Sequence, residues 1–208
     1  MIRRLVVASV AIAAWALLIL SGEIYLWRFQ LTAGATGETL KQWPEKSSIR
    51  RQDGLFTLLL FLHPKCPCSR ASFDAATQVA AGAQGKLNLC LVFVKPAGSD
   101  KDWEKTDLWK QGKATSGCTV FTDEGGSESQ NFGAKTSGHV LLYDPAGQLR
   151  FSGGLTSSRG QPGPSAGLQA VVQLLNGGSV EDIHRPVFGC PLLDSASPGE
   201  GEETTCHP

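Results

Sequence analysis

Hydrophobic residues along the chain fall into runs whose lengths predict a membrane-spanning helix followed by an α/β domain. Residues 5–22 carry no charge and are mostly apolar, which is about the length of a helix that crosses a bilayer. Residues 55–62 form a shorter apolar run and residues 86–96 a second one, both typical of strands buried on two faces of a sheet. Between them, residues 69–82 place apolar side chains at helical spacing and end at a glycine. The order strand, helix, strand predicts a right-handed parallel unit.

The second half of the chain predicts a different arrangement. We expect a short helix at residues 100–112, a strand and turn at 118–126, a brief helix at 127–134, a hairpin at 139–154 and an amphipathic closing helix at 167–178. The hairpin is indicated by the turn residues Asp144 and Gly147, which separate an apolar strand from an alternating one. The two halves together predict a central mixed sheet flanked by helices.

These patterns divide the chain into four parts. They are an N-terminal transmembrane anchor (1–29), a linker (30–54), the α/β domain (55–178) and a C-terminal tail (179–208). The tail is rich in Pro, Gly, Glu and Ser, except for the apolar segment "VFGCPL" at residues 187–192. We expect this segment to dock back onto the domain.

The charges that flank the apolar span predict its orientation. Arg3 and Arg4 precede it, so the N-terminus should stay in the cytoplasm and the rest of the chain should be exported. We therefore expect a single-pass protein of the inner (cytoplasmic) membrane whose C-terminal domain is periplasmic. A cleaved signal peptide is the alternative, but its apolar region is usually about 7 to 15 residues long. The longer run here, followed by Tyr25 and Trp27 that suit a membrane interface, favours a retained anchor.

Charge and cysteine content narrow the function classes. The 19 Lys and Arg residues balance the 19 Asp and Glu residues, so no basic surface for nucleic acid is expected. Six cysteines in 208 residues are too few to build a disulfide-stapled domain, so the core must come from packing. Outside the cytoplasm, however, a close pair of cysteines can cycle between dithiol and disulfide.

One such pair, Cys66 and Cys68, flanks Pro67 between the first predicted strand and its helix. The backbone preferences of proline place Cys66 at or near the N-cap and Cys68 in the first helical turn. The helix N-terminus favours a thiolate, so the pKa of Cys66 should be lowered and its sulfur accessible for attack. Because positions two apart do not face each other on a helix, a bridge between the two cysteines would be strained and oxidising.

The same two sulfurs suit a soft metal ion. Thiolates select Cu(I), and imidazole tolerates copper, so Cys66 and Cys68 with His63 or His139 form an alternative metal site. Each histidine also has a structural interpretation. His63 can hydrogen bond to the loop at a strand end, and His139 can pack within the hairpin.

The other cysteines divide by position. Cys190, in the apolar tail segment, could resolve a mixed disulfide at Cys66, supply a third metal ligand, form a structural bridge or be an ordinary buried cysteine. Cys90 and Cys118 lie in or beside strands and are expected to be core residues. Cys206 is either incidental or a loose metal ligand with the neighbouring His207.

Several motifs carry a family resemblance. "FLHPKCPCSRAS", "SGHVLLYD", "FSGGLTSSRG" and "VFGCPL" together resemble the thioredoxin-like proteins of the RedB type, over residues 43–192. The second half of the domain is similar to that of the membrane-anchored TlpA and ResA thiol-disulfide proteins. The resemblance implies a thioredoxin-like fold and exchange of electrons with a protein thiol or disulfide, without a cofactor.

The chain also departs from that pattern. Ser69 stands where thioredoxin-like reductases have their second cysteine, and Gly138 stands where they have a cis-proline facing the cysteines. Loss of that proline makes a metal site more plausible, as in the copper-delivering SCO proteins, which share the fold and space their cysteines more widely. A thiol peroxidase is a third interpretation, although the Thr-x-x-Cys signature is missing.

Overall fold

The structure, a computed structural model, describes residues 2–193 of the 208-residue chain. The chain divides into two compact units that separate after Thr32, and each is described by itself. The predicted C-terminal pair Cys206 and His207 lies outside the described residues.

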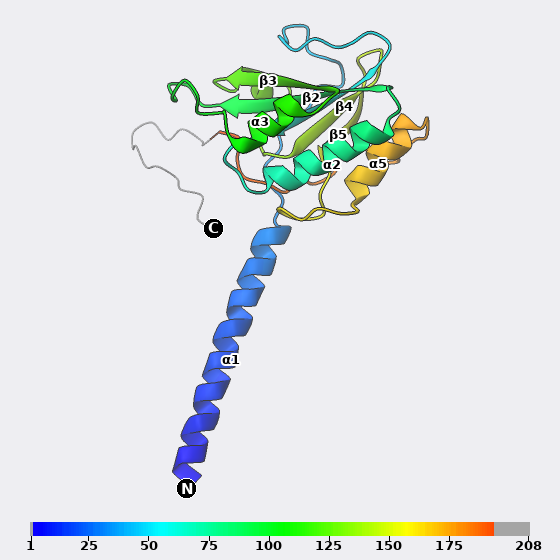
Figure 1. Ribbon diagram of the computed structural model, residues 1–208. Helices are drawn as coiled ribbons and strands as arrows, with labels where there is room; N and C mark the ends of the chain where they lie inside the picture. Colours follow the sequence, from blue (N-terminus) through cyan, green and yellow to red (C-terminus); the bar gives the residue numbers. More distant parts are fainter. Residues whose placement is uncertain (1, 194–208) are drawn as a thin grey trace. The chain divides into compact units, whose positions relative to one another are not determined.

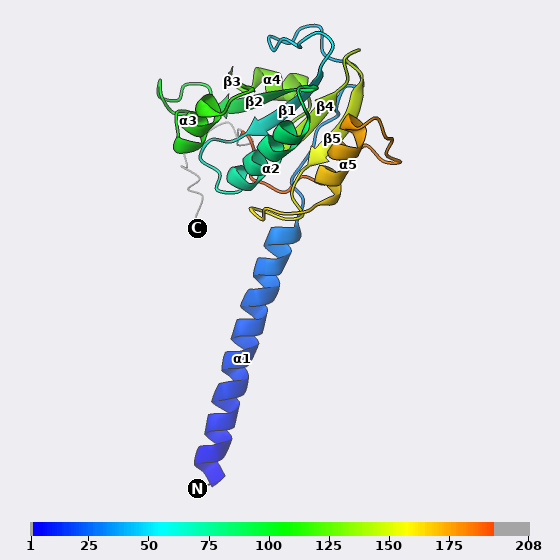
Figure 2. The ribbon, with the colours of Figure 1, turned by 45° about the vertical axis from the view of Figure 1, so that its right-hand side comes forward.

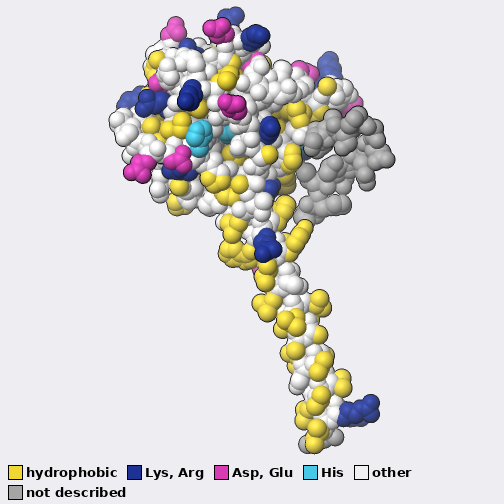
Figure 3. Space-filling model, turned by 180° about the vertical axis from the view of Figure 1, so that it is seen from behind, with side chains coloured by type: hydrophobic (Ala, Val, Ile, Leu, Met, Phe, Trp, Pro, Cys, Tyr) yellow, Lys and Arg dark blue, Asp and Glu magenta, His cyan; other side chains and the backbone are white. Residues whose placement is uncertain are grey.

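The first unit is a single helix, α1 (Ile2–Leu31). Its 30 residues include a window with a mean hydropathy of 2.4, and none of its described side chains is buried in protein. Hydrophobic side chains run along its length, with basic side chains near its N-terminal end (Figure 3). Among the described residues it is the one helix long and apolar enough to cross a membrane. A signal sequence would pass the same test of length and composition.

The second unit is built on a five-stranded sheet with the strand order β3-β2-β1-β4-β5 (Figure 1). The strands are β1 (Phe56–Leu62), β2 (Leu87–Lys95), β3 (Cys118–Glu124), β4 (His139–Tyr143) and β5 (Leu149–Gly154). The first three are parallel, whereas β4 runs antiparallel to both β1 and β5. The predicted mixed sheet flanked by helices, and with it the thioredoxin-like fold, is confirmed.

The two central strands consist almost wholly of apolar residues because they are covered on both faces. In β1, Leu58, Leu60 and Leu62 join the core on one face, while Leu59 and Phe61 join the core on the other. This alternation follows from the two-residue period of a strand. An apolar run without polar gaps is therefore what a strand in this position requires.

One face of the sheet is covered by helices. Helices α2 (Ser69–Gly82) and α5 (Ala166–Leu175) lie side by side over it, and α3 (Asp107–Ala114) adds Leu108 to the same core (Figure 2). Phe73 of α2 and Val171 of α5 are among its buried residues. This packing fixes the start of α2 just beyond the end of β1.

The other face is covered by shorter pieces of chain. Helix α4 (Ser127–Asn131) leads into Phe132, whose ring packs edge-on against Trp43 with centroids 5.0 Å apart. Trp43 also packs edge-on against Tyr143 of β4, at 5.1 Å. Segments from before the first strand and after the last helix thus complete the second core.

The helix expected at residues 100–112 begins later, at Asp107. Thr106 is its N-cap, and the side chain of Thr106 accepts a hydrogen bond from the Trp109 amide. Residues before it form turns, such as the one closed by Trp103 N–H and the Asp100 carbonyl at 3.1 Å. Threonine followed by aspartate is a typical helix start, because the threonine side chain caps a free amide and the aspartate charge interacts favourably with the helix N-terminus.

Residues 183–193 form a segment that we call the C-terminal strap. Its first part follows the outer edge of β5, where the amide of Ser152 donates to the Ile183 carbonyl and the amide of Arg185 donates to the Ser152 carbonyl. Val187 and Leu192, further along, are buried in the second unit. The strap therefore adds to the sheet edge and then crosses toward the start of α2.

Candidate functional site

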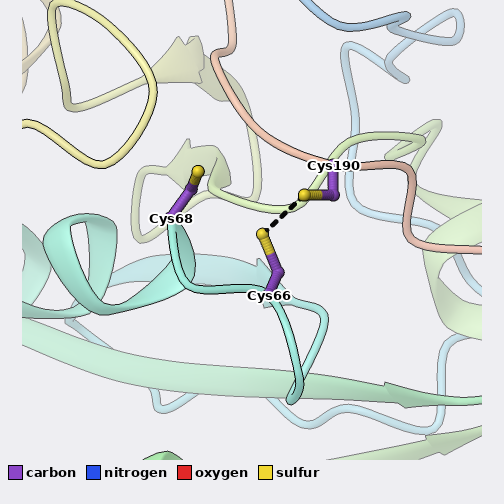
Figure 4. Close-up of side chains that lie close together, drawn as sticks. All are labelled: Cys66, Cys68 and Cys190. Carbon is purple, nitrogen blue, oxygen red and sulfur yellow. Dashed lines mark hydrogen bonds between the residues drawn. The ribbon is translucent and has the colours of Figure 1, made fainter. Parts of the chain in front are cut away.

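Three cysteines meet where the strap passes the start of α2. The Sγ atoms of Cys66, Cys68 and Cys190 all lie within 4.8 Å of one another. Cys66 and Cys190 approach most closely, with their sulfurs 2.9 Å apart and pointing toward each other (Figure 4). A disulfide bond is about 2.03–2.05 Å long, so these are free thiols within hydrogen-bonding distance. We call this group the three-cysteine cluster.

The loop between β1 and α2 positions the first two of these cysteines. A turn closes as the Cys66 amide donates to the His63 carbonyl at 3.1 Å, and a second one as the Ser69 amide donates to the Cys66 carbonyl at 3.1 Å. Helix α2 begins at Ser69, and Cys68 is its N-cap. The prediction that Cys68 lies in the first helical turn is therefore off by one position, although its backbone dihedrals are already helical. Cys66 precedes the N-cap by two residues.

Buried serines hold this loop against the segment before β4. Ser69 Oγ donates to the His63 carbonyl at 2.9 Å and lies 2.8 Å from Ser137 Oγ. The His63 amide donates to Ser137 Oγ at 2.9 Å. Ser69 stands where thioredoxin-like reductases have their second cysteine. In this structure its hydroxyl holds the loop through hydrogen bonds. The sequence reasoning missed Ser137, although it stands directly before the quoted glycine and histidine of "SGHV".

The strap brings the third sulfur into the cluster through main-chain pairing. The Ser137 amide donates to the Cys190 carbonyl at 2.8 Å, and the Leu192 amide donates to the Lys135 carbonyl at 2.9 Å. Between them, Thr136 and Pro191 form an antiparallel bridge. The Arg159 guanidinium also donates to the Gly189 carbonyl. Cys190 is therefore held in register like a residue of a sheet.

The burial of Cys66 corrects one prediction about its side chain. The side chain expected to be accessible, Cys66, is only 4% exposed. Cys68 and Cys190 are partly exposed. The sequence reasoning placed Cys66 at an open helix start, but the strap carries Cys190 across it. The same loop borders a pocket of about 240 Å³ that reaches Arg70 and the start of α3.

The close contacts between the three sulfurs shift their pKa values in different directions. The pKa of Cys66 is lowered from 9.0 to about 2, chiefly by the hydrogen bond from Cys190 and next by the one from Cys68. These hydrogen bonds outweigh burial, which acts to raise the pKa. The pKa of Cys190 is raised because its thiol donates to Cys66 and to Cys68. At Cys68 the hydrogen bond with Cys190 lowers the pKa, but the hydrogen bond to Cys66, burial and the Cys66 charge together raise it. The cluster thus holds one negative charge, centred on Cys66.

The direction of the Cys66 shift agrees with the sequence prediction, but its cause is different. The sequence argument assigned it to the helix N-terminus. Here the largest contributions come from two neighbouring thiols, one of which lies far along the chain. Hydrogen bonding to the charged form favours that form whatever the secondary structure nearby.

The two histidines considered as ligands lie outside the cluster. The ring of His63 packs edge-on against Trp103, with centroids 5.3 Å apart. His139 is fully buried, and its Nε2 lies 2.9 Å from Ser152 Oγ. Burial, with a smaller effect of His184, lowers the pKa of His139 to about 4, so its ring is neutral at pH 7. Among the described residues, the group that could hold a metal contains the three cysteines and neither histidine.

Gly138 stands next to the site but admits no side chain. Its φ is +90°, and a Cβ atom there would lie 2.6 Å from Ser72 Oγ. Its amide donates to the Phe61 carbonyl at 2.8 Å, a bond that proline cannot make. No peptide bond between described residues is cis. The backbone at this position is therefore built for glycine.

The remaining described cysteines are outside the site. Cys90 is buried in β2, and burial raises its pKa to about 12. The pKa of Cys118, at the start of β3, is also raised by burial. Cys90 is therefore a core residue, as expected, whereas Cys118 is only partly buried and packs against the edge of the core. Thiols with raised pKa values are poor nucleophiles at neutral pH.

Comparisons with known proteins support the fold. No protein-family model matches the chain, and no curated protein sequence matches it. The structure is similar to a hypothetical protein from Sinorhizobium meliloti 1021, at 19% identity over 77% of this chain and 93% of that one, with a TM-score of 0.56. An uncharacterized conserved protein from Geobacillus kaustophilus matches at 14% identity over 80% and 95% of the two chains, with a TM-score of 0.57.

The second unit has a thioredoxin-like fold. Its sheet joins a parallel crossover from β1 through α2 to β2 with an antiparallel β4–β5 hairpin, the two halves expected of that fold from the sequence. A secreted Mycobacterium tuberculosis disulfide oxidoreductase also matches, at 14% identity over 60% of this chain and 83% of that one, with a TM-score of 0.42. Similarity at these identities concerns the fold, so the chemistry has to be argued from the cluster itself.

Proposed function

We propose that the protein is a membrane-anchored thiol-disulfide exchange protein of the RedB type, with Cys66 as nucleophile and Cys190 as the resolving cysteine. The observation that carries this proposal is the 2.9 Å approach of the two sulfurs, with the negative charge on Cys66. The thiolate is the reactive form of cysteine. A thiolate beside a second thiol is the arrangement that two-step disulfide exchange requires.

The exchange proceeds in two balanced steps. The Cys66 thiolate attacks one sulfur of a partner disulfide, and the other partner sulfur leaves as a thiolate that takes up a proton. Cys190 then loses its proton and attacks the Cys66 sulfur, which forms the Cys66–Cys190 disulfide and releases the second partner thiol. Two electrons pass to the partner, which is reduced while the protein is oxidised. Run in reverse, the same steps oxidise a partner dithiol.

The hydrogen bonding explains how Cys190 becomes reactive at the right moment. Its pKa is raised chiefly by donation to the Cys66 thiolate. Once Cys66 is in a mixed disulfide, that negative charge is gone and the main cause of the raised pKa disappears. Cys190 can then ionise next to the bond that it must attack. Cys68, within 4.8 Å of both sulfurs, is the alternative resolving thiol, at the cost of strain in a Cys-Pro-Cys bridge.

The location proposed for this chemistry is the periplasmic side of the inner membrane. Helix α1 supplies one span, and Arg3 and Arg4 favour a cytoplasmic N-terminus. Thiols outside the cytoplasm are not kept reduced by default, so a cycling pair there needs a protein partner that reduces or oxidises it. The proposed partners are therefore proteins with reactive thiols or disulfides.

The test is a trapping experiment with the full chain in membranes. Replacing both possible resolving thiols, by Cys68→Ser together with Cys190→Ser, leaves Cys66 able to attack but unable to release its partner, so mixed disulfides should accumulate on Cys66 and disappear on reduction. Cys118→Ser is the matched control, since Cys118 lies outside the cluster. Equilibration with glutathione buffers should show a two-electron transition in the wild type, and the double variant Cys66→Ser, Cys190→Ser, which keeps one thiol of the cluster, should lack it. A wild-type cluster that stays reduced at every glutathione ratio would rule out the exchange function.

A second candidate function, Cu(I) binding by an assembly factor, is favoured by one observation. Three sulfurs within 4.8 Å of one another offer an all-thiolate donor set, and soft thiolates select Cu(I). The residues proposed as ligands are Cys66, Cys68 and Cys190 in place of the histidines. Competition for Cu(I) against a chromogenic chelator should give one ion per chain, with affinity reduced by each Cys→Ser change. Binding that is unchanged in Cys190→Ser would exclude this three-sulfur site.

A further inference from the structure

We propose that strap residues 189–192 (Gly-Cys-Pro-Leu) are an internal substrate, which a cysteine-containing segment of the partner replaces during exchange. The partner segment would have the pattern glycine, cysteine, any residue, apolar residue. This inference rests on the proposed exchange function and names the class of protein segment that the site accepts.

The main chain of Lys135, Thr136 and Ser137 forms a short docking edge for an extended segment. Two hydrogen bonds, from the Ser137 amide to the Cys190 carbonyl and from the Leu192 amide to the Lys135 carbonyl, enclose the bridge at Thr136. Apart from the sulfur contact, this pairing uses only the backbone of the strap. Backbone pairing accepts any extended chain, while specificity comes from the pockets that receive alternate side chains.

The residue before the cysteine must be glycine for steric reasons. A Cβ atom on Gly189 would overlap the Ser137 carbonyl oxygen, and it would also press on the Thr136 side chain. Gly189 is not among the residues with positive φ, so its backbone conformation is open to any residue. The close approach alone excludes a side chain. A partner segment that pairs in the same register would need glycine at the same position, because a side chain there would overlap the Ser137 carbonyl oxygen.

The position two residues after the cysteine is the apolar anchor. Leu192 is 1% exposed and belongs to the core on the second face of the sheet, together with Phe132 and Tyr143. A charged residue there would be buried without a partner, which is strongly unfavourable. Pro191, between the cysteine and Leu192, has no amide hydrogen to donate to the docking edge. A partner segment can therefore carry any residue at this position.

Displacement of the strap would also explain how a partner reaches Cys66, which is buried. Cys66 is 4% exposed, and the Cys190 sulfur lies 2.9 Å from its own. When residues 189–192 leave, the docking edge and the Cys66 sulfur become free together. A partner cysteine that takes the place of Cys190 then stands beside the Cys66 thiolate, as Figure 4 shows for the internal cysteine. When the strap returns, Cys190 is delivered to the mixed disulfide and resolves it.

The first experiment measures sequence preference with defined peptides. The full chain carrying Cys68→Ser and Cys190→Ser, in detergent, keeps Cys66 as the one thiol of the cluster. The octapeptide of residues 186–193 (PVFGCPLL) is offered as a mixed disulfide with thionitrobenzoate. The Cys66 thiolate attacks the peptide sulfur, a Cys66–peptide disulfide forms and coloured thionitrobenzoate leaves. Matched peptides carry alanine in place of the glycine or aspartate in place of the first leucine.

We expect the parent peptide to react at least about tenfold faster than either altered peptide, and mass spectrometry should place the adduct on Cys66. Equal rates for the three peptides would overturn the inference and leave the exchange function standing. A simple aromatic disulfide without a peptide serves as the reference reagent. Failure of Cys66 to react with that reagent as well as with the peptides would instead count against the exchange function itself.

The second experiment releases the strap in an otherwise unchanged full chain. Gly189→Ala should displace residues 189–192, which raises the rate of Cys66 alkylation by a small neutral reagent at least about tenfold. It should also speed hydrogen exchange at the Leu192 amide. Gly82→Ala is the matched control, because an added Cβ there meets nothing within 4 Å. Circular dichroism checks that both variants keep their fold, and Arg159→Ala, which removes the bond to the Gly189 carbonyl, provides a second route to release. Unchanged Cys66 alkylation in both strap variants would overturn the inference.

Discussion

The Sγ atoms of Cys66 and Cys190 lie 2.9 Å apart, although the two residues are separated by 124 positions in the sequence. Mild oxidation of the full chain should therefore join Cys66 to Cys190 rather than to Cys68, since almost no movement is needed. Peptide mapping of the non-reduced protein measures the pairing. The Cys190→Ser variant should oxidise more slowly, because only the strained Cys66–Cys68 bridge is left. A wild-type protein in which Cys66–Cys68 predominates would contradict the prediction.

The lowered pKa of Cys66 has a definite consequence for stability against pH. The folded pKa is about 2 and the ordinary value is 9.0, so between these limits the unfolded chain binds the extra proton. The contribution of Cys66 to stability is complete above pH 9 and is lost as the pH falls toward 2. The slope is at most about 1.4 kcal/mol per pH unit for one proton.

Urea unfolding of the wild type and of Cys66→Ser between pH 4 and pH 8 measures this effect. The difference in free energy of unfolding should grow in favour of the wild type as the pH rises. Above pH 9 the raised pKa values of Cys68 and Cys190 act in the opposite direction. A difference that stays constant across the range would show that Cys66 titrates like a free cysteine.

The buried ion pair between Lys95 and Glu104 allows a matched test of stability. Nζ of Lys95 lies 3.5 Å from a carboxylate oxygen of Glu104, and the two side chains are 9% and 7% exposed. Glu104→Ala should cost about 3 kcal/mol, because it leaves the buried ammonium without its main counter-charge. Lys95 lies equally far from Glu124, whose side chain is 72% exposed. Glu124→Ala should therefore cost less than about 1 kcal/mol, and similar losses for the two variants in thermal or urea unfolding would contradict this account.

Gly138 should tolerate no other residue. Gly138→Ala combines a positive φ with a contact of 2.6 Å to Ser72 Oγ, and a loss of about 2 kcal/mol or more is expected. Repeating the change in a Ser72→Ala background removes the hydroxyl but keeps the backbone strain. The loss should then become smaller without vanishing. Equal losses in the two backgrounds, measured by urea unfolding, would show that the serine contact has no effect.

Much of the fold follows from local sequence signals. The helix predicted at residues 69–82 has those bounds in the structure, and the first strand differs by a single residue. Long apolar runs and a glycine stop are strong signals, because burial on two faces leaves no place for a polar residue. The helix expected at residues 100–112 begins only at Asp107, because the Thr106 side chain caps its first turn.

Less of the candidate site than of the fold could be predicted from the sequence. Cys66 and Cys68 were identified from their position between a strand and a helix, but the accessibility of Cys66 was wrong. That property depends on the pairing of Cys190 with a docking edge more than fifty residues earlier in the chain. No local pattern encodes such a register, and the same holds for the thiol–thiol contacts that lower the Cys66 pKa.

The three-cysteine cluster contains an odd number of sulfurs, so a disulfide within it always leaves one cysteine unpaired. Whichever two of the three cysteines join, the third remains reduced within 4.8 Å of the new bond and can attack it. If the cluster is oxidised, three disulfide pairings would therefore be open to it and could interconvert without an outside reductant. Because the cluster has three sulfurs, an internal disulfide always leaves one thiol available to a partner.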